Sequence, residues 1–219
     1  MSTPDGSPLM PKRRSTSVNM TVGEKNRVPT QAADHDFKPT DTLTPCGIFL
    51  PASNDLWLSF VRSKLTADAI VDCLEDWWQQ VKARFPHIHR WVINADNGPE
   101  NHSRRTQFMA RLVALAQREQ LTIQLAYYPR YHSKYHPVER TFGWLEQHWQ
   151  GSLLDSVETV IHFAKSLAFK GHHPTVSLVT RTYHTGVKLT QKAMRELEQQ
   201  LWRLPGLEKW FVEIAPMPV

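Results

Sequence analysis

Cysteine and long apolar runs are both scarce in this chain of 219 residues. Its only cysteines, Cys46 and Cys73, are too few for a disulfide scaffold, and no Cys-x-x-Cys pair is present to hold zinc. No apolar run approaches the roughly 20 residues that a membrane helix requires. The basic residues at 12–14 precede no apolar segment, so we expect no signal peptide. We therefore expect a cytoplasmic protein with free thiols rather than a secreted, disulfide-rich or membrane protein.

Acidic residues are outnumbered by basic ones. The chain has 26 Lys and Arg against 21 Asp and Glu, which gives a formal net charge of +5. A mild basic excess favours polyanionic partners. Apolar residues make up 41% of the chain, enough for a sizeable core, and the length fits one domain or one domain plus an arm.

The first 44 residues differ from the rest of the chain. They hold five prolines and no aromatic residue except Phe37, so we expect a poorly ordered arm. Val18, Met20 and Val22 alternate with polar residues and are followed by Gly23, which predicts a short, degenerate first strand.

Residues 45–150 predict an α/β core. Apolar runs at 46–50 and 56–61 flank turn-forming residues and predict a hairpin. Thr66 is the expected N-cap of a helix with apolar residues at helical spacing up to Phe85. The further pattern predicts a strand at 91–93, a helix at 102–119, a strand at 121–126 and a helix at 137–150. A meander of strands followed by alternating helices and strands indicates a sheet of mixed direction.

Residues 151–219 predict a helical C-terminal extension. The apolar pattern favours helices near 156–169 and 190–203. Tryptophans that lie at helical spacing along the whole chain are expected in the core, among them Trp77, Trp78, Trp144 and Trp149.

Two acidic residues occupy positions at which catalytic carboxylates are common. Asp96 follows the strand at 91–93, and Glu139 begins the helix after the next strand. In an α/β sheet both can face the edge at which sites form. Two carboxylates there repel each other unless a cation such as Mg²⁺ compensates them. The alternative is that Asp96 is a turn residue and Glu139 an acid that stabilises the first helical turn.

The motifs around these acids resemble a known family. The stretches that carry the resemblance are 94–101, 127–129 and 132–140, with further similarity at 33–37, 151–155 and 185–190. Together they resemble the catalytic core of bacterial insertion-sequence Asp-Asp-Glu (DDE) transposases, in particular the Rhodopirellula-type transposase domain, over roughly residues 20–214.

The resemblance implies an RNase H-like fold, with a mixed five-stranded sheet flanked by helices. It also implies two Mg²⁺ ions, replaceable by Mn²⁺, held by three carboxylates. Asp96 matches the family's second acid and Glu139 its third. The partners implied are the DNA of the transposon ends and of the target, bound by a homo-oligomer. The implied reaction is hydrolysis at the end of the element, followed by attack of the freed 3′-hydroxyl on target DNA.

The first family acid has no counterpart here. The segment expected to carry it, residues 15–22, contains no Asp or Glu. The helix-rich region that binds DNA ends in such transposases is also not found, so the chain resembles an N-terminally truncated member. Family members typically have Asn where this chain has His136.

DNA contact has some support from the residues themselves. Between positions 102 and 150 there are seven Arg and Lys against three Glu, interleaved with tyrosines. Cations neutralise phosphates, and rings stack on exposed bases. The candidates are Arg104, Arg105, Arg130, Lys134, Arg140, Tyr128 and Tyr131, with Tyr127 and Tyr135 in the same loop. The alternative is a solvated helix face and a loop packed on the core.

The sequence leaves other interpretations open. His132 and His136 could form a transition-metal site, but local hydrogen bonding in the loop is the simpler interpretation. The chain could be an inactive transposase remnant that binds DNA or an intact transposase. It could also be a two-carboxylate hydrolase such as a glycosidase, which needs no metal.

Overall fold

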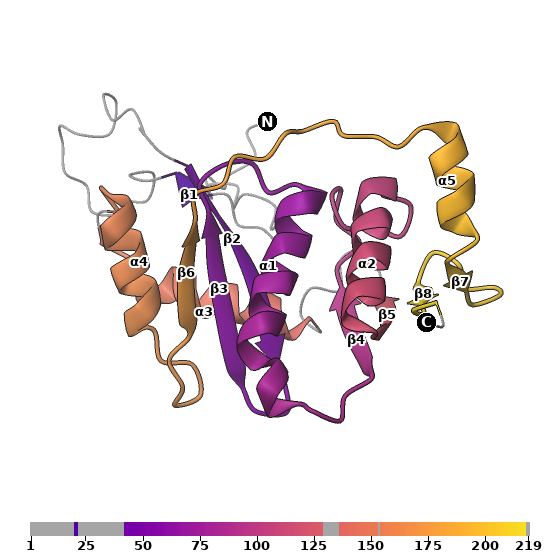
Figure 1. Cartoon of the computed structure of the whole chain (residues 1–219). Coiled ribbons are helices and arrows are strands. Elements are labelled where there is room, and N and C mark those ends of the chain that lie inside the picture. The colour runs from indigo at the N-terminus through magenta and orange to yellow at the C-terminus, as the bar shows by residue number, and fades with distance from the viewer. Residues whose placement is uncertain (1–19, 22–41, 129–135, 153, 218–219) are drawn as a thin grey trace, which may run out of the picture.

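The computed structural model describes residues 20–21, 42–128, 136–152 and 154–217. Its strands form two separate sheets (Figure 1). The first sheet has the order β1-β2-β3-β6, from Met20–Thr21, Thr42–Leu50, Asp55–Val61 and Thr175–Val179. Both β1 and β3 pair with β2 in antiparallel fashion, whereas β6 is parallel to β3.

The second sheet has the order β4-β5-β8-β7. The two central parallel strands of the predicted core form half of it, β4 at Arg90–Ala95 and β5 at Thr122–Tyr127. The C-terminal strand β8, Phe211–Ile214, runs antiparallel to β5 and pairs on its other side with β7, Trp202–Arg203.

The prediction of one five-stranded sheet is therefore wrong. The hairpin β2-β3 and the pair β4-β5 belong to different sheets, and no ladder joins β2 to β4 in the described part of the chain. The C-terminal extension is also not purely helical, because it supplies β6, β7 and β8. These strands have only two to five residues, so their period-2 pattern is too short to stand out from the helical pattern around them.

Helix α1, Ala67–Val81, confirms the predicted N-cap. The Thr66 hydroxyl accepts a hydrogen bond from the Ala69 backbone N–H at 3.3 Å. The α-helix ends four residues before Phe85, and a 3₁₀ turn, Lys82–Arg84, continues it toward Pro86. Pro86 disfavours the α conformation at the residue before it, which explains the ending.

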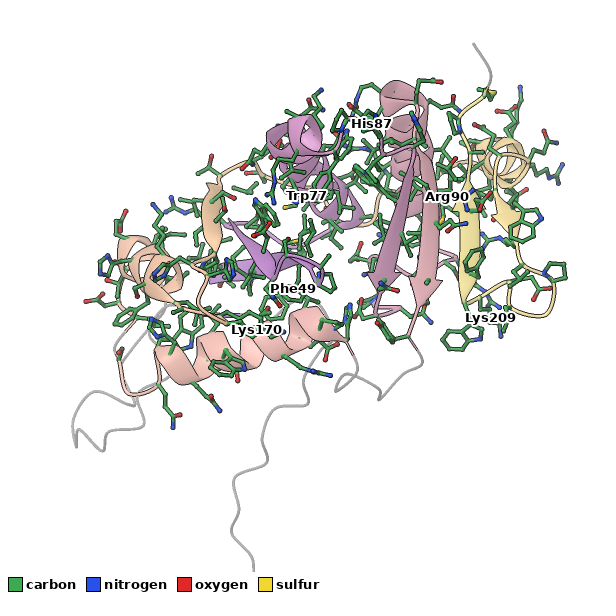
Figure 2. All side chains as sticks on the ribbon, turned by 90° about the horizontal axis from the view of Figure 1, so that it is seen from below. Phe49, Trp77, His87, Arg90, Lys170 and Lys209 are labelled. Atoms are coloured by element: carbon green, nitrogen blue, oxygen red, sulfur yellow. The ribbon has the colours of Figure 1, made fainter. Side chains whose placement is uncertain are left out.

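Helices cover opposite faces of the first sheet. Seen from below, α1 lies on one side of β2 and β3, and α3, Pro137–His148, lies on the other (Figure 2). Helix α2, Thr106–Glu119, packs with α1 and the second sheet in one hydrophobic cluster. Helix α4, Val157–Ser166, shares a second cluster with α3 and the first sheet. The remaining helix, α5, covers Gln191–Glu198. Among the described helices, none is long and apolar enough to cross a membrane.

The tryptophans divide between core and surface. Trp77, Trp78 and Trp91 make edge-on or tilted ring contacts with centroids 4.8–6.1 Å apart. Trp149 is also buried, whereas Trp144 is 52% exposed, which corrects the expectation that it lies in the core. It lies on the outer side of α3, and its contact with Phe169, 5.7 Å between centroids, covers part of the ring.

A buried carboxylate joins three parts of the fold. Asp72 on α1 accepts hydrogen bonds from Arg111 of α2 at 2.6 Å and from the Tyr183 hydroxyl at 2.8 Å, and it also pairs with Arg181. Burial alone would raise the pKa of Asp72, but the hydrogen bonds from Arg111 and Tyr183 and the neighbouring positive charges hold that pKa below its usual value. This network connects the two helices to the segment that follows β6.

We expect Asp72→Asn to lower the free energy of unfolding at neutral pH by about 2 kcal/mol, because it leaves Arg111 without its main partner. Since the folded-state pKa of Asp72 is depressed, the stabilisation is complete above the unfolded pKa of about 3.9 and disappears as the pH falls through the folded pKa. Urea titrations across pH measure this. Asp76→Asn, at an exposed position of the same helix, is the control.

Candidate functional site

Asp96 is the first residue after β4, where the chain turns sharply. Asn97 adopts a positive φ of 62°, and this turn directs the chain toward α2. Asp96 is only 7% exposed. Its Oδ1 accepts a hydrogen bond from Asn101 Nδ2 at 2.8 Å, whereas its Oδ2 is buried without a partner. A buried carboxylate oxygen with no partner is costly unless a cation or water satisfies it.

The lack of a side chain at Gly98 lets the backbone lie close to that oxygen. A Cβ at this position would lie 3.1 Å from Asp96 Oδ2 and 3.0 Å from Asn101 Oδ1, which is also buried without a partner. Both unpartnered oxygens therefore lie close to Gly98. Carboxylate and amide oxygens are hard ligands of the kind that Mg²⁺ and Mn²⁺ accept.

Glu139 lies in the first turn of α3, two residues after Pro137 at the first helical position. Its side chain is 8% exposed, so it is not the solvated acid typical of a helix N-terminus. One oxygen, Oε1, lies 3.6 Å from Nδ1 of His136. The fold therefore holds this acid inside the protein, next to a titratable ring.

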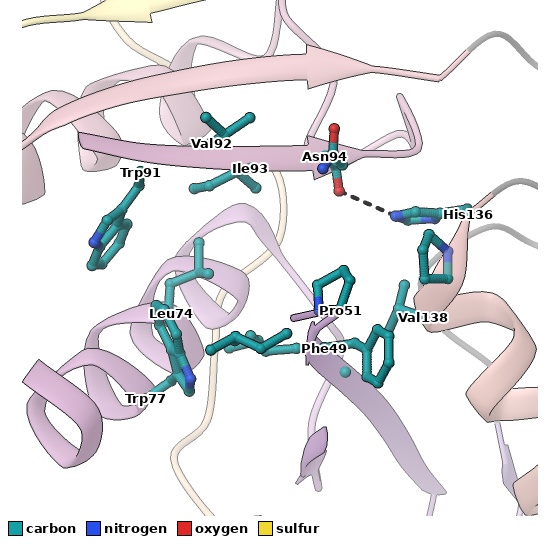
Figure 3. A pocket seen from close by; sticks show the side chains of 14 residues that line it. Phe49, Pro51, Leu74, Trp77, Trp91, Val92, Ile93, Asn94, His136 and Val138 are labelled. Atoms are coloured by element: carbon teal, nitrogen blue, oxygen red, sulfur yellow. Dashed lines mark hydrogen bonds between the residues drawn. The ribbon is translucent and has the colours of Figure 1, made fainter. Parts of the chain in front are cut away.

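His136 connects α3 to the end of β4. Its Nε2 lies 3.1 Å from the backbone carbonyl of Asn94, two residues before Asp96 (Figure 3). Because a carbonyl oxygen only accepts, Nε2 must carry a proton. This bond spans 42 residues, so the expectation of local hydrogen bonding for His136 is wrong. His132 lies outside the described residues.

The remaining ring nitrogen of His136 has no hydrogen-bond partner. In the neutral ring Nδ1 is an acceptor that faces the Glu139 carboxylate, and two acceptors this close need a proton or a cation between or beside them. His136, Asp96 and Asn101 thus each present an unpartnered acceptor atom in the region where β4 ends and α3 begins. Such a region can bind a cation or move a proton.

The side chains at the candidate site provide only some of the ligands that a metal ion requires. Asp96, Asn101 and Glu139 supply oxygen ligands of the type that a hard cation needs. Within the described ranges, however, no three His, Cys, Asp or Glu side chains converge on one point. The residues therefore fit a cation at Asp96 and supply Glu139 as a second buried acid, without a complete three-acid set among the described residues.

The predicted DNA-binding residues have different surroundings. Arg104 and Arg140 are exposed, whereas Arg105 is partly buried and pairs with Glu100 at 3.0 Å. The Tyr128 ring packs on His136 with centroids 4.9 Å apart. Arg130, Tyr131, Lys134 and Tyr135 lie outside the described residues.

Three residues that form part of the site were not predicted to belong to it. Asn101 braces Asp96, Gly98 lets the backbone lie close to it, and buried Tyr127 donates its hydroxyl to the Asn101 carbonyl at 2.8 Å. Tyr127 is therefore not available for base stacking. Its burial raises the pKa of its hydroxyl, which stays a donor at neutral pH. The position of Asn101, five residues after Asp96 in an Asn- and Gly-rich turn, is the only sequence signal that could have suggested its role.

We expect His136→Ala to lower the free energy of unfolding by about 2 kcal/mol, because the buried His136 ring is lost and the Asn94 carbonyl loses its partner at a part-buried position. Equilibrium urea unfolding measures this loss. His148→Ala is the matched control, since His148 lies at the other end of α3 and its bond to the Ser166 hydroxyl is exposed. Equal small losses for both variants would contradict a connecting role of His136.

Comparison with known proteins gives a match to a protein family. The model of the family described as Rhodopirellula transposase DDE domain matches residues 18–216. Neither the curated proteins nor the solved structures give a match. The family match covers nearly the whole chain and includes the turn with Asp96 and the helix with Glu139. This chain therefore belongs to the Rhodopirellula transposase DDE domain family.

Proposed function

We propose that this chain is a DNA transposase catalytic domain that hydrolyses a phosphodiester at the end of an insertion sequence and transfers the strand to target DNA, with a divalent metal ion. One observation carries the proposal. The buried Asp96 has an oxygen without a partner that faces Gly98, and His136, which bonds the end of β4, precedes a helix whose first turn buries Glu139. The family to which the chain belongs typically uses a divalent metal.

The residues of the candidate site would have different roles. Asp96 and Glu139 would hold Mg²⁺, which supplies Lewis-acid stabilisation of the charge that develops on phosphate oxygens. Asn101 fixes the carboxylate of Asp96 through Oδ1 and leaves Oδ2 free for the ion. His136 fixes the start of α3 against β4, and its Nδ1 faces Glu139.

The DNA strands would follow the exposed cations around this region. Arg104 lies in the turn before α2, and Arg140 lies in the first turn of α3 beside Glu139. Arg130, Lys134 and Tyr131 lie in the sequence between β5 and α3, and Tyr128 directly follows β5. Arg105 is the weakest candidate, because its ion pair with Glu100 already engages it. We further propose a cytoplasmic homo-oligomer that assembles on DNA.

A second candidate function follows from the missing first acid. Residues 15–22 include no Asp or Glu, and the described residues bring no three acids together. Ligand charge sets the affinity of a hard-cation site, so a site with two acids binds metal more weakly than one with three. In this case the chain is a catalytically inactive member of its family that binds DNA or associates with an intact transposase.

The first test is a thermal unfolding titration with Mn²⁺. A ligand that binds only the folded state stabilises it by about 2.7 kcal/mol at a concentration 100 times its Kd. We expect Mn²⁺ to raise the unfolding temperature of the wild type on the order of 5 °C. Asp96→Asn and Glu139→Gln keep side-chain size and remove charge, so both should abolish most of the shift.

Glu158→Gln is the control for unspecific binding of Mn²⁺ to surface acids, since Glu158 is exposed in the first turn of α4. A shift that survives in both site variants would contradict the proposed metal site. A folded wild type without any shift would favour the inactive member. Nicking of supercoiled plasmid, with and without EDTA, then separates metal-dependent cleavage from binding alone.

The second test measures DNA affinity against salt without metal. We expect Arg104→Ala to weaken binding uniformly across sequences and to reduce the slope of log K against log salt by about 1, because one phosphate contact is lost. Fluorescence anisotropy with a labelled duplex measures the slope. Arg84→Ala is the control, since Arg84 is engaged with Asp55 at 2.7 Å. An unchanged slope in the Arg104 variant would remove this residue from the proposed DNA path.

A further inference from the structure

The turn that follows Asp96 is anchored by side chains of two strands. The Tyr127 hydroxyl of β5 donates to the Asn101 carbonyl at 2.8 Å. Nη2 of Arg203, on β7, donates to the Ser103 carbonyl at 3.0 Å, across 100 residues of sequence. Asn101 and Ser103 are both at most 5% exposed, so their carbonyls depend on partners within the protein. The backbone of this turn is therefore fixed at two positions.

Arg203 is itself held rigidly by the C-terminal segment, whose strands join the second sheet next to β5 (Figure 1). Its Nε and Nη2 donate to the two carboxylate oxygens of Glu198, at the end of α5, at 3.1 and 2.9 Å. Its Nη1 donates to the Glu208 carbonyl at 3.2 Å. All three guanidinium nitrogens therefore have a partner in the protein. Because the planar fork of arginine fixes the direction of its donors, the segment aims one of them at the turn.

The anchored turn carries the residue that orients Asp96. Asn101 Nδ2 donates to Asp96 Oδ1 at 2.8 Å, and Oδ2 is the carboxylate oxygen without a partner. The side chain of Asn101 is short, so its reach to Asp96 depends on where the backbone of the turn lies. Ser103 is only two residues further along this turn. A displacement of the Ser103 carbonyl therefore moves Asn101 and releases the carboxylate of Asp96.

We propose that Arg203 is a positioning residue of the candidate site, which holds the turn at 97–105 so that Asn101 keeps Oδ2 of Asp96 directed at the metal ion. Its effect on metal affinity rests on the function proposed above, whereas its hold on the turn needs no metal. The C-terminal segment thereby takes part in the site, although it lies outside the alternating strands and helices that carry Asp96 and Glu139. Loss of the fork loosens the turn and weakens metal binding while the protein stays folded.

Arg203→Lys in the full-length chain tests this role, because it keeps the charge and replaces the fork by a single ammonium. We expect amide hydrogen exchange in peptides that cover residues 97–105 to become about tenfold faster, since a buried hydrogen bond is lost there. The Kd of Mn²⁺, measured by isothermal titration calorimetry, should rise about tenfold, as is typical when a residue that orients a metal ligand is changed. Arg195→Lys, at an exposed position of α5, is the matched control and should change neither the exchange nor the Kd.

The outcomes distinguish a failure of this role from a failure of the proposed function. Faster exchange confined to residues 202–211 shows that Arg203 serves only its own segment, which overturns the proposal. An unchanged Kd of Mn²⁺ in Arg203→Lys also overturns it, while the metal site stands. If the wild type binds no Mn²⁺, the proposed metal site fails, and the exchange of residues 97–105 alone decides whether Arg203 holds the turn.

Glu198→Gln covers the case in which Arg203→Lys unfolds. The side chain of Glu198 is 53% exposed, so the variant removes the charged pair that directs the guanidinium without opening the core. We expect exchange in the peptides that cover residues 97–105 to become about threefold faster, because Arg203 is then held less firmly. Unchanged exchange in these peptides overturns the proposal.

Discussion

A hydrogen bond from His136 Nε2 to the Asn94 carbonyl connects the start of α3 to the end of β4 at the candidate site. Helix α3 packs on the first sheet, whereas Asn94 belongs to the second sheet. Because no ladder joins β2 to β4 among the described strands, the position of Glu139 relative to Asp96 depends on this contact and on the packing around it. The bond also fixes the protonated nitrogen of His136 and thus leaves the other one facing Glu139.

Side chains hold the two sheets together where backbone pairing does not. On one face, α1 and α2 share a hydrophobic cluster with the second sheet, and the tryptophans of α1 contact Trp57 of β3 and Trp91 of β4. The Asp72 network adds the segment after β6 to this side. Between the sheets a cavity remains, lined by unpaired strand edges and indole donors without partners. Packing is therefore incomplete between β2 and β4.

The polar atoms without partners indicate the chemistry more clearly than any single motif. Native structures satisfy most buried polar groups, so each exception points to a ligand, a water or a functional strain. At the candidate site the exceptions are acceptors, on Asp96, Asn101 and His136, as expected where a cation or proton binds. At the cavity they include two donors, on Trp77 and Trp91, and His136 also belongs to its lining. The cavity therefore adjoins the candidate site.

The sequence by itself determined the local elements and the candidate acids. Helical spacing, the Thr66 cap and the Pro137 start predicted α1 and α3, and the turn after 91–93 singled out Asp96, because these signals act over neighbouring residues. Family membership was also readable from short motifs and is confirmed. Only the tertiary structure decided that the strands divide into two sheets and that His136 bonds to Asn94 and Asn101 to Asp96. Strand order and side-chain pairing depend on contacts between distant segments, and no local pattern encodes which edges meet.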